Sequence, residues 1–138
     1  MFAVEKLHHV AIPAHDFARL QAFYVDVLGL QAHPEKSNWL RAGDGFSVHL
    51  MPSTAPSGIP RIEQHFALQV DSLHDLLAHL LNRDLTPWQA SLDGQVHQVR
   101  DRGDPLDFGL GSLFITDPGN NVLEFLQRDK GLFGSISS

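Results

Sequence analysis

The sequence contains no cysteine. This absence excludes disulfides, thiolate nucleophiles, iron–sulfur clusters and cysteine-based zinc sites. Any metal ion must therefore be held by nitrogen and oxygen atoms. Nitrogen ligands are plentiful, because nine of the 138 residues are histidine, the side chain that most often ligates metals.

The sequence also lacks a basic surplus and long apolar runs. Ten lysines and arginines stand against 16 acidic residues, for a net charge of −6, so a nucleic-acid partner is not expected. No apolar stretch approaches the length that spans a bilayer, and the N-terminus lacks a signal-peptide pattern, so no membrane role is expected. The hydrophobic content of 43% predicts one compact domain. Because both kinds of segment are lacking, a cytoplasmic protein is the default expectation.

A short sequence that begins with histidine occurs twice. His9-Val10-Ala11-Ile12 returns 56 positions later as His65-Phe66-Ala67-Leu68. The alternation in each copy predicts a strand whose histidine faces away from the helix-covered side. After each strand a capping residue, Asp16 or Ser72, begins an apolar helical pattern, and Gly29 suits the end of the first helix.

Each copy is expected to continue with three strands. The predicted segments are Gln31 to His33, Trp39 to Arg41 and Phe46 to Met51, then Val96 to Val99, Ser112 to Thr116 and Val122 to Leu126. A repeated unit that cannot cover its own sheet implies that two copies pack together. The prediction is an α+β fold of two β-α-β-β-β modules that form one curved mixed sheet around a cleft. The modules cover about 5–52 and 63–128, with a proline-rich linker at 53–62 and a tail at 129–138.

The last strand of each module carries one polar residue between apolar neighbours, His49 in the first and Glu124 in the second. A pseudo-two-fold axis between the modules would bring both residues to the same concave face as His9 and His65. Imidazole nitrogens with one carboxylate suit Zn, Ni, Fe, Mn or Co, whereas calcium and magnesium prefer mainly oxygen ligands. We therefore expect one divalent transition metal in the cleft, its element left open.

Four further residues are candidates for substrate binding. Arg41, His97 and Arg100 lie on or beside predicted strands, where an arginine would suit a carboxylate or phosphate. Phe108 lies in the glycine-rich segment 100–111, which is predicted to form a rim that closes over substrate. The alternative is that these are solvated strand and loop residues. Tyr24 lies on the apolar stripe of the first helix and is interpreted as a core residue.

Four stretches carry a family resemblance: Leu7 to Ile12, Phe23 to Leu30, His65 to Asp71 and Phe114 to Phe125. Together they resemble the vicinal oxygen chelate superfamily, which includes glyoxalase I, bleomycin resistance proteins and extradiol dioxygenases. The resemblance covers nearly the whole chain. It implies that His9, His65 and Glu124 hold the metal, and that Glu124 is a candidate base.

His49 departs from the family pattern, because it falls where glyoxalase I enzymes place a glutamate. Three roles stay open for it: metal ligand, hydrogen-bond partner of a bound substrate, or a side chain that fills the mouth of the cleft. As a ligand or as a substrate contact, it counts among the candidate catalytic residues.

The resemblance implies a metal-dependent lyase or isomerase of the glyoxalase type. Its substrate would be a small oxygenated metabolite or thiol conjugate that chelates the ion through two neighbouring oxygens. Two alternatives remain: a ring-cleaving or other Fe(II) dioxygenase, and a drug-binding protein of the bleomycin-resistance kind without turnover. The resemblance also implies a homodimer.

Overall fold

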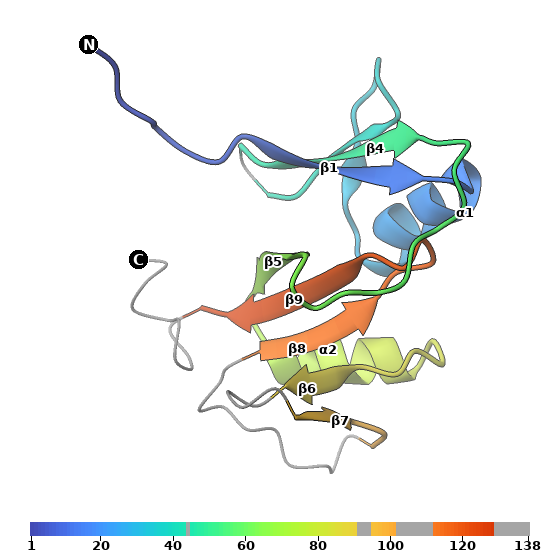
Figure 1. Ribbon diagram of the computed structural model, residues 1–138. Coiled ribbons are helices and arrows are strands. Elements are labelled where there is room, and N and C mark those ends of the chain that lie inside the picture. The colour runs from blue at the N-terminus through green and yellow to red at the C-terminus, as the bar shows by residue number, and fades with distance from the viewer. Residues whose placement is uncertain (44, 91–94, 102–111, 129–138) are drawn as a thin grey trace. The chain divides into compact units, whose positions relative to one another are not determined.

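The computed structural model describes residues 1–43, 45–90, 95–101 and 112–128. The chain divides into two compact units, each with its own sheet (Figure 1). The first unit is Met1–Ile59 with Asp117–Asn120, and the second is Pro60–Thr116 with Asn121–Ser138. In the described residues, no helix has the length and apolar character needed to span a bilayer.

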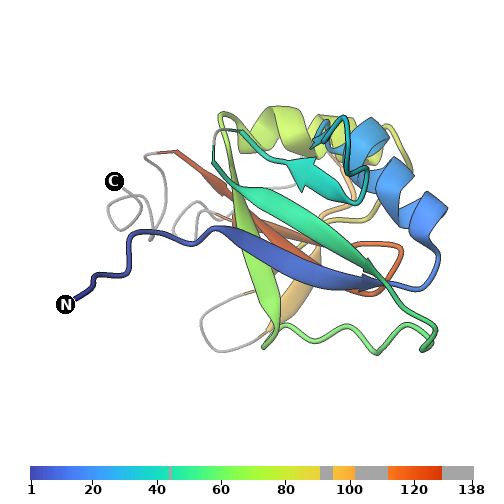
Figure 2. The ribbon, with the colours of Figure 1, turned by 90° about the horizontal axis from the view of Figure 1, so that it is seen from above.

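The first unit holds a four-stranded sheet in the order β1-β4-β3-β2. Its strands are β1 (His9–Ala14), β2 (Gln31–Ala32), β3 (Trp39–Arg41) and β4 (Ser47–Pro52). β1 and β4 run in parallel, as Figure 2 shows, and the other pairs are antiparallel. Ile12, Leu40, Val48 and Leu50 are buried, while Ala11 and Arg41 between them in the alternation are exposed. One face of this sheet therefore forms core and the other is open.

The helical segment of the first unit begins as the sequence predicts. The carboxylate of Asp16 accepts a hydrogen bond from the backbone N–H of Arg19 at 3.2 Å and caps α1 (Phe17–Ala22). The chain then widens into a π-helical segment, η1 (Phe23–Val27), with a bond from the Leu28 N–H to the Phe23 carbonyl. Gly29, at φ +77°, ends it in the left-handed region.

Tyr24 is a fully buried residue of η1 with a polar end. Its hydroxyl donates a hydrogen bond of 2.7 Å to Oδ2 of Asp117, which is also buried and belongs to the same unit. The other oxygen of Asp117 accepts from the N–H of Gly119. Burial, with the charge and hydrogen bond of Asp117, raises the pKa of Tyr24 well above its ordinary value. Tyr24 is thus a core residue, as its position on the apolar stripe indicates.

The second unit holds a five-stranded sheet in the order β5-β9-β8-β6-β7. Its strands are β5 (His65–Val70), β6 (Trp88–Ala90), β7 (Val96–Gln98), β8 (Ser112–Thr116) and β9 (Val122–Gln127). β5 and β9 are parallel, and the other neighbours are antiparallel. Helix α2 (Leu73–Leu81) begins at Ser72, whose hydroxyl accepts from the N–H of Asp75, and it buries one leucine stripe.

Two details of the strand prediction are corrected. The sequence pattern missed β6, because this strand follows a proline and its central residue, Gln89, is polar although buried. The Gln89 side chain donates to the Ser112 carbonyl at 2.8 Å, which makes its burial tolerable. β7, predicted as the first of three strands, is an additional edge strand beside β6. The two β-α-β-β-β modules are confirmed, and their strands pair in two sheets where the sequence predicts one.

Candidate metal centre

The second module brings His65 and Glu124 together. In the parallel pair of β5 and β9, Ala67 is opposite Glu124 and His65 is two positions earlier, so both polar side chains share a face. Nε2 of His65 lies 3.5 Å from Oε1 of Glu124. The two side chains are 31% and 12% exposed, which leaves the pair accessible but shielded from much of the solvent.

The hydrogen bond on the far side of the His65 ring decides which nitrogen is free. Nδ1 lies 2.6 Å from the carbonyl oxygen of Ile62. Since a carbonyl only accepts, Nδ1 carries a proton, and Nε2 is the ring nitrogen that faces the Glu124 carboxylate. Ligating histidines are commonly oriented by such a carbonyl.

Two electron-pair donors that face each other need a cation between them, either a proton on Nε2 or a metal ion. Ligand atoms that are each about 2.1 Å from a tetrahedral ion lie roughly 3.4 Å apart, close to the separation of Nε2 and Oε1. The donor set of His65 and Glu124 therefore fits a divalent transition metal.

The first module repeats this arrangement with different chemistry. In β1 and β4, Ala11 is opposite His49 and His9 is two positions earlier, the same register as in the second module. The rings of His9 and His49 have centroids 6.0 Å apart. Nδ1 of His9 is hydrogen-bonded to Nδ1 of His8 at 2.9 Å, which leaves Nε2 of His9 as the nitrogen for a ligand. Within the described ranges, no third His, Asp or Glu side chain joins either pair to make a metal-binding group.

His49 is surrounded by two residues that the sequence did not single out. Its ring stacks on Trp39 with centroids 4.0 Å apart and an interplanar angle of 11°. Its Nε2 lies 3.2 Å from the amide nitrogen of Asn38. The period-two alternation of β3 places Trp39 on the face of His49, but nothing in the sequence shows that Asn38, just before the strand, reaches the ring.

Aromatic rings lie beside the His65 and Glu124 pair. Phe114 is opposite Glu124 in β8, and Trp88 is opposite Phe114 in β6. The rings of Trp88 and Phe114 stack at 4.5 Å, and the ring of Phe114 meets that of His65 edge-on at 5.4 Å. The sequence pattern does not indicate this pair, because Trp88 belongs to β6, which has no hydrophobic alternation. The candidate ligands of the second module therefore stand against an apolar aromatic wall.

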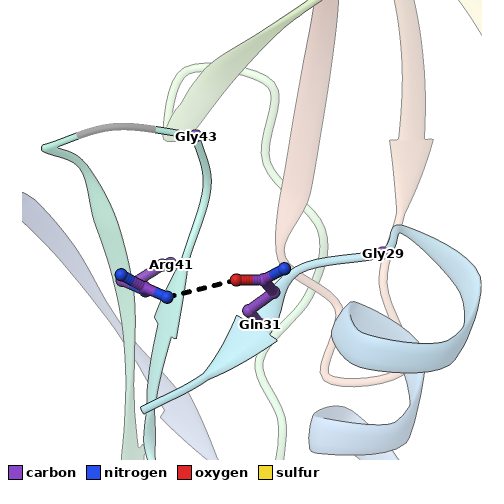
Figure 3. Close-up of a pocket in the computed structure, with 4 residues that line it drawn as sticks. All are labelled: Gly29, Gln31, Arg41 and Gly43. Carbon is purple, nitrogen blue, oxygen red and sulfur yellow. Dashed lines mark hydrogen bonds between the residues drawn. The ribbon is translucent and has the colours of Figure 1, made fainter.

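Arg41 lies on the same face as His9, two strands away. Across the four strands of the first sheet, Gln31 is opposite Arg41, Arg41 is opposite Ser47, and Ser47 is opposite His9. The guanidinium donates a hydrogen bond of 3.1 Å to the Gln31 side chain, and both line a pocket of about 250 Å³ with Gly29 and Gly43 (Figure 3). This places one cationic group on the open face of the first module.

The remaining predicted substrate residues lie farther from the candidate ligands. His97 is opposite Gln89, on the other face of the second sheet from Trp88 and Glu124. Arg100 follows the edge strand β7 and bonds to the Gln98 side chain at 3.0 Å. Phe108 and most of the predicted rim lie outside the described residues.

Comparison with protein families gives one match over most of the chain. Residues 6–125 match the family model described as the Glyoxalase/Bleomycin resistance protein/Dioxygenase superfamily. Among curated proteins, the chain is similar to the uncharacterized protein YaeR of Escherichia coli (strain K12). The two are 29% identical over 93 residues, which cover 58% of this chain and 72% of YaeR.

Solved structures show the same fold at low sequence identity. The oxidase ChaP-H1 aligns with a TM-score of 0.67 and 22% identity over 91% of this chain and 97% of its own. TnmS3, an antibiotic-binding protein from Streptomyces sp. CB03234, aligns at 0.60 and 19% identity over 92% and 98%. An integron cassette protein from the Halifax Harbour sewage outfall metagenome, HFX_CASS4, aligns at 0.64 and 21% identity over 94% and 100%.

Proposed function

Because the chain belongs to the Glyoxalase/Bleomycin resistance protein/Dioxygenase superfamily, we propose that it is a divalent-metal-dependent lyase or isomerase of the glyoxalase type. Its substrate would be a small oxygenated metabolite or a thiol conjugate. One observation carries the proposal: Nε2 of His65 and the carboxylate of Glu124 face each other at 3.5 Å, with the other ring nitrogen of His65 held by a backbone carbonyl.

In this proposal His9, His65 and Glu124 hold the ion. When bound, a divalent metal supplies Lewis-acid stabilisation of negative charge that develops on two neighbouring substrate oxygens. Glu124 is also proposed as the base, because a carboxylate that holds the ion would lie within reach of a proton on a substrate chelated there. The aromatic wall of Phe114 and Trp88 would exclude water and cover the apolar part of the substrate.

Arg41 is proposed to receive an anionic group of the substrate. It is on the open face two strands from His9, and a guanidinium binds a carboxylate or phosphate through paired N–H groups. His97 and Arg100 have less support, since His97 is on the opposite face from Glu124 and Arg100 lies at the sheet edge.

Oxidation by Fe(II) is the second candidate function. Two histidines with one carboxylate form the donor set of many non-haem iron oxygenases. The chain also shares its fold with the oxidase ChaP-H1, at 22% identity. We further propose a cytoplasmic homodimer, in keeping with a superfamily whose members bind small molecules and often dimerise.

The test is metal analysis of protein purified without chelators. We expect about one divalent transition ion per chain, and less than about one tenth of that in His65→Ala, because removal of a ligand weakens the site severely. His97→Ala is the matched control and should retain the ion. Nickel or zinc would favour the lyase or isomerase, and iron would favour the oxidase. A metal-free wild type under metal-replete conditions would overturn the proposal in favour of a protein that binds a ligand without turnover.

A further inference from the structure

His49 has the position of Glu124 in the register but a different environment. Glu124 faces a histidine nitrogen, whereas His49 is enclosed by the stacked ring of Trp39 and the amide of Asn38. Asn38 is itself fixed to the neighbouring strand, since its backbone carbonyl accepts from the Leu50 N–H at 2.8 Å. The side chain of Asn38 thus approaches His49 from an anchored backbone position.

The contacts of Asn38 determine how its amide is oriented. The amide nitrogen lies 3.5 Å from the carbonyl oxygen of Leu50 and 3.2 Å from Nε2 of His49. A carbonyl oxygen only accepts hydrogen bonds, so the Asn38 atom that faces it is the NH₂ group. The same group therefore donates to His49, and Nε2 of His49 is the acceptor. An accepting Nε2 in a neutral imidazole requires that Nδ1 carries the proton.

The orientation of the His49 ring is also restrained by stacking. Stacking on Trp39 at an interplanar angle of 11° prevents the His49 ring from turning over freely. In the described part of the chain, no group makes a hydrogen bond to Nδ1 of His49. Among the residues that the structure describes, the first module therefore presents an oriented N–H donor that no protein group accepts.

We propose that His49 is held by Asn38 and Trp39 as a neutral Nδ1–H imidazole, which donates a hydrogen bond to an oxygen of the substrate and does not ligate the metal. This rests on the proposed function for the presence of a metal-chelating substrate. Ligation through Nε2 would break the bond from Asn38, and ligation through Nδ1 would require the opposite tautomer. The substrate class is narrowed to compounds with an accepting oxygen, a carbonyl or carboxylate, beside the chelating pair. Asn38 and Trp39 are positioning residues.

The tautomer can be measured directly by long-range ¹H–¹⁵N correlation spectra of the histidine rings, assigned with single His→Gln variants. In metal-free protein we expect His49 to show a protonated Nδ1 and an unprotonated Nε2. On addition of Zn²⁺, the nitrogens of His9 and His65 should shift to metal-bound values while those of His49 keep their tautomer. A metal-bound shift at His49, or the Nε2–H tautomer in the metal-free protein, would overturn the proposal.

A variant that removes the Asn38 amide tests the role of the donor. In Asn38→Ala the amide no longer selects the tautomer of His49, so Nδ1 is no longer held as the N–H group. Oxalate is the probe for Zn²⁺-loaded protein, because two of its oxygens can chelate an ion while the other two remain free to accept hydrogen bonds. Asn38→Ala should weaken oxalate binding about fivefold, the loss of roughly one hydrogen bond. Gln21→Ala, which removes an amide hydrogen bond to the Ser37 carbonyl in the same module, is the control and should change it little.

The outcomes separate this proposal from the proposed function. If wild-type protein binds no Zn²⁺, the proposed function fails, while the metal-free tautomer of His49 still decides the present proposal. If Zn²⁺ binds and Asn38→Ala leaves oxalate affinity unchanged, the donor role of His49 is wrong and the metal site stands.

Discussion

The two modules share one register but use it for different chemistry. In both, a histidine on the first strand lies two positions before the residue that pairs with the polar side chain of the last strand. In the second module that side chain is Glu124, and it faces His65 at 3.5 Å. In the first module it is His49, which stacks on Trp39 and lies 6.0 Å from His9 between ring centroids. A repeated backbone therefore fixes where a side chain stands, and the neighbours of that side chain decide what it does.

The groups that hydrogen-bond His65 and His49 differ: one accepts from the ring and the other donates to it. The Ile62 carbonyl accepts from Nδ1 of His65 and so leaves Nε2 with a free lone pair. The Asn38 amide donates to Nε2 of His49 and so occupies that lone pair. An acceptor at Nδ1 of His65 and a donor at Nε2 of His49 select the same Nδ1–H tautomer, but only His65 keeps Nε2 available for a metal ion. The comparison teaches that the position of a histidine alone does not identify a ligand.

The largest effect is expected from amide substitutions at the two corresponding positions. Glu124→Gln should weaken Zn²⁺ binding by about 100-fold, because it removes the only carboxylate of the donor set. His49→Gln should leave Zn²⁺ affinity within about threefold, since Nε2 of His49 is already in use. Isothermal titration calorimetry on both variants measures the difference directly. Equal losses at the two positions would mean that the modules contribute ligands symmetrically.

The residues of this site also show which of its features the sequence could predict. The doubled histidine strand and the two capping residues are local signals, and they correctly predict two modules of one kind. The strand registers place Arg41 on the face of His9, a pairing that the sequence left open. By contrast, the tautomers of His49 and His65 depend on Asn38 and Ile62, which no periodicity connects to them. Pairing of side chains in space is the information that a single sequence lacks.

The strand β6 illustrates the same limit for the fold. Its three residues include a buried glutamine, so the hydrophobic alternation that identifies a strand is absent. Only the carbonyl of Ser112, 23 residues later, makes Gln89 acceptable in the core. Missing β6 also hid Trp88 and its stack on Phe114. The aromatic wall could not be predicted because burial of Gln89 depends on a hydrogen bond to a residue far away in the sequence.

An intermediate effect, on protein stability, is expected at a position where the helical segments of the two modules differ. Tyr24 corresponds to Leu80, 56 positions later, and both side chains are completely buried. A buried leucine needs no hydrogen-bond partner, whereas the buried Tyr24 hydroxyl donates to Asp117. In Tyr24→Phe, the Asp117 carboxylate loses this donor. We expect this variant to be less stable by about 2 kcal/mol, a typical cost for a hydrogen bond to a charged group. In urea unfolding, the cost should largely vanish in an Asp117→Ala background, which has no side-chain acceptor for the Tyr24 hydroxyl, and additive effects would contradict the coupling.

Ionisation of Tyr24 is also expected to destabilise the folded protein at alkaline pH. The pKa of Tyr24 is raised in the folded state by burial and by Asp117, so the folded protein keeps the phenol protonated where the unfolded chain ionises. Stability is then fully present below about pH 10 and is lost as pH rises above this value. Tyr24 is the only tyrosine, so tyrosinate absorbance reports it alone. Ionisation near the ordinary pKa in folded protein would disprove the effect.

The smallest effect concerns the two helix caps, which correspond in position but differ in charge. Asp16 and Ser72 each accept a hydrogen bond from the N–H three residues later, at 3.2 and 3.1 Å. Replacement of either by alanine should cost about 1 kcal/mol in chemical denaturation. The carboxylate of Asp16 also interacts with the helix dipole, and salt screens this part of the energy. The cost of Asp16→Ala should therefore fall in about 1 M salt while that of Ser72→Ala stays constant, and Ser72→Asp should acquire the salt dependence. Equal salt responses at both caps would show that charge adds nothing to the hydrogen bond.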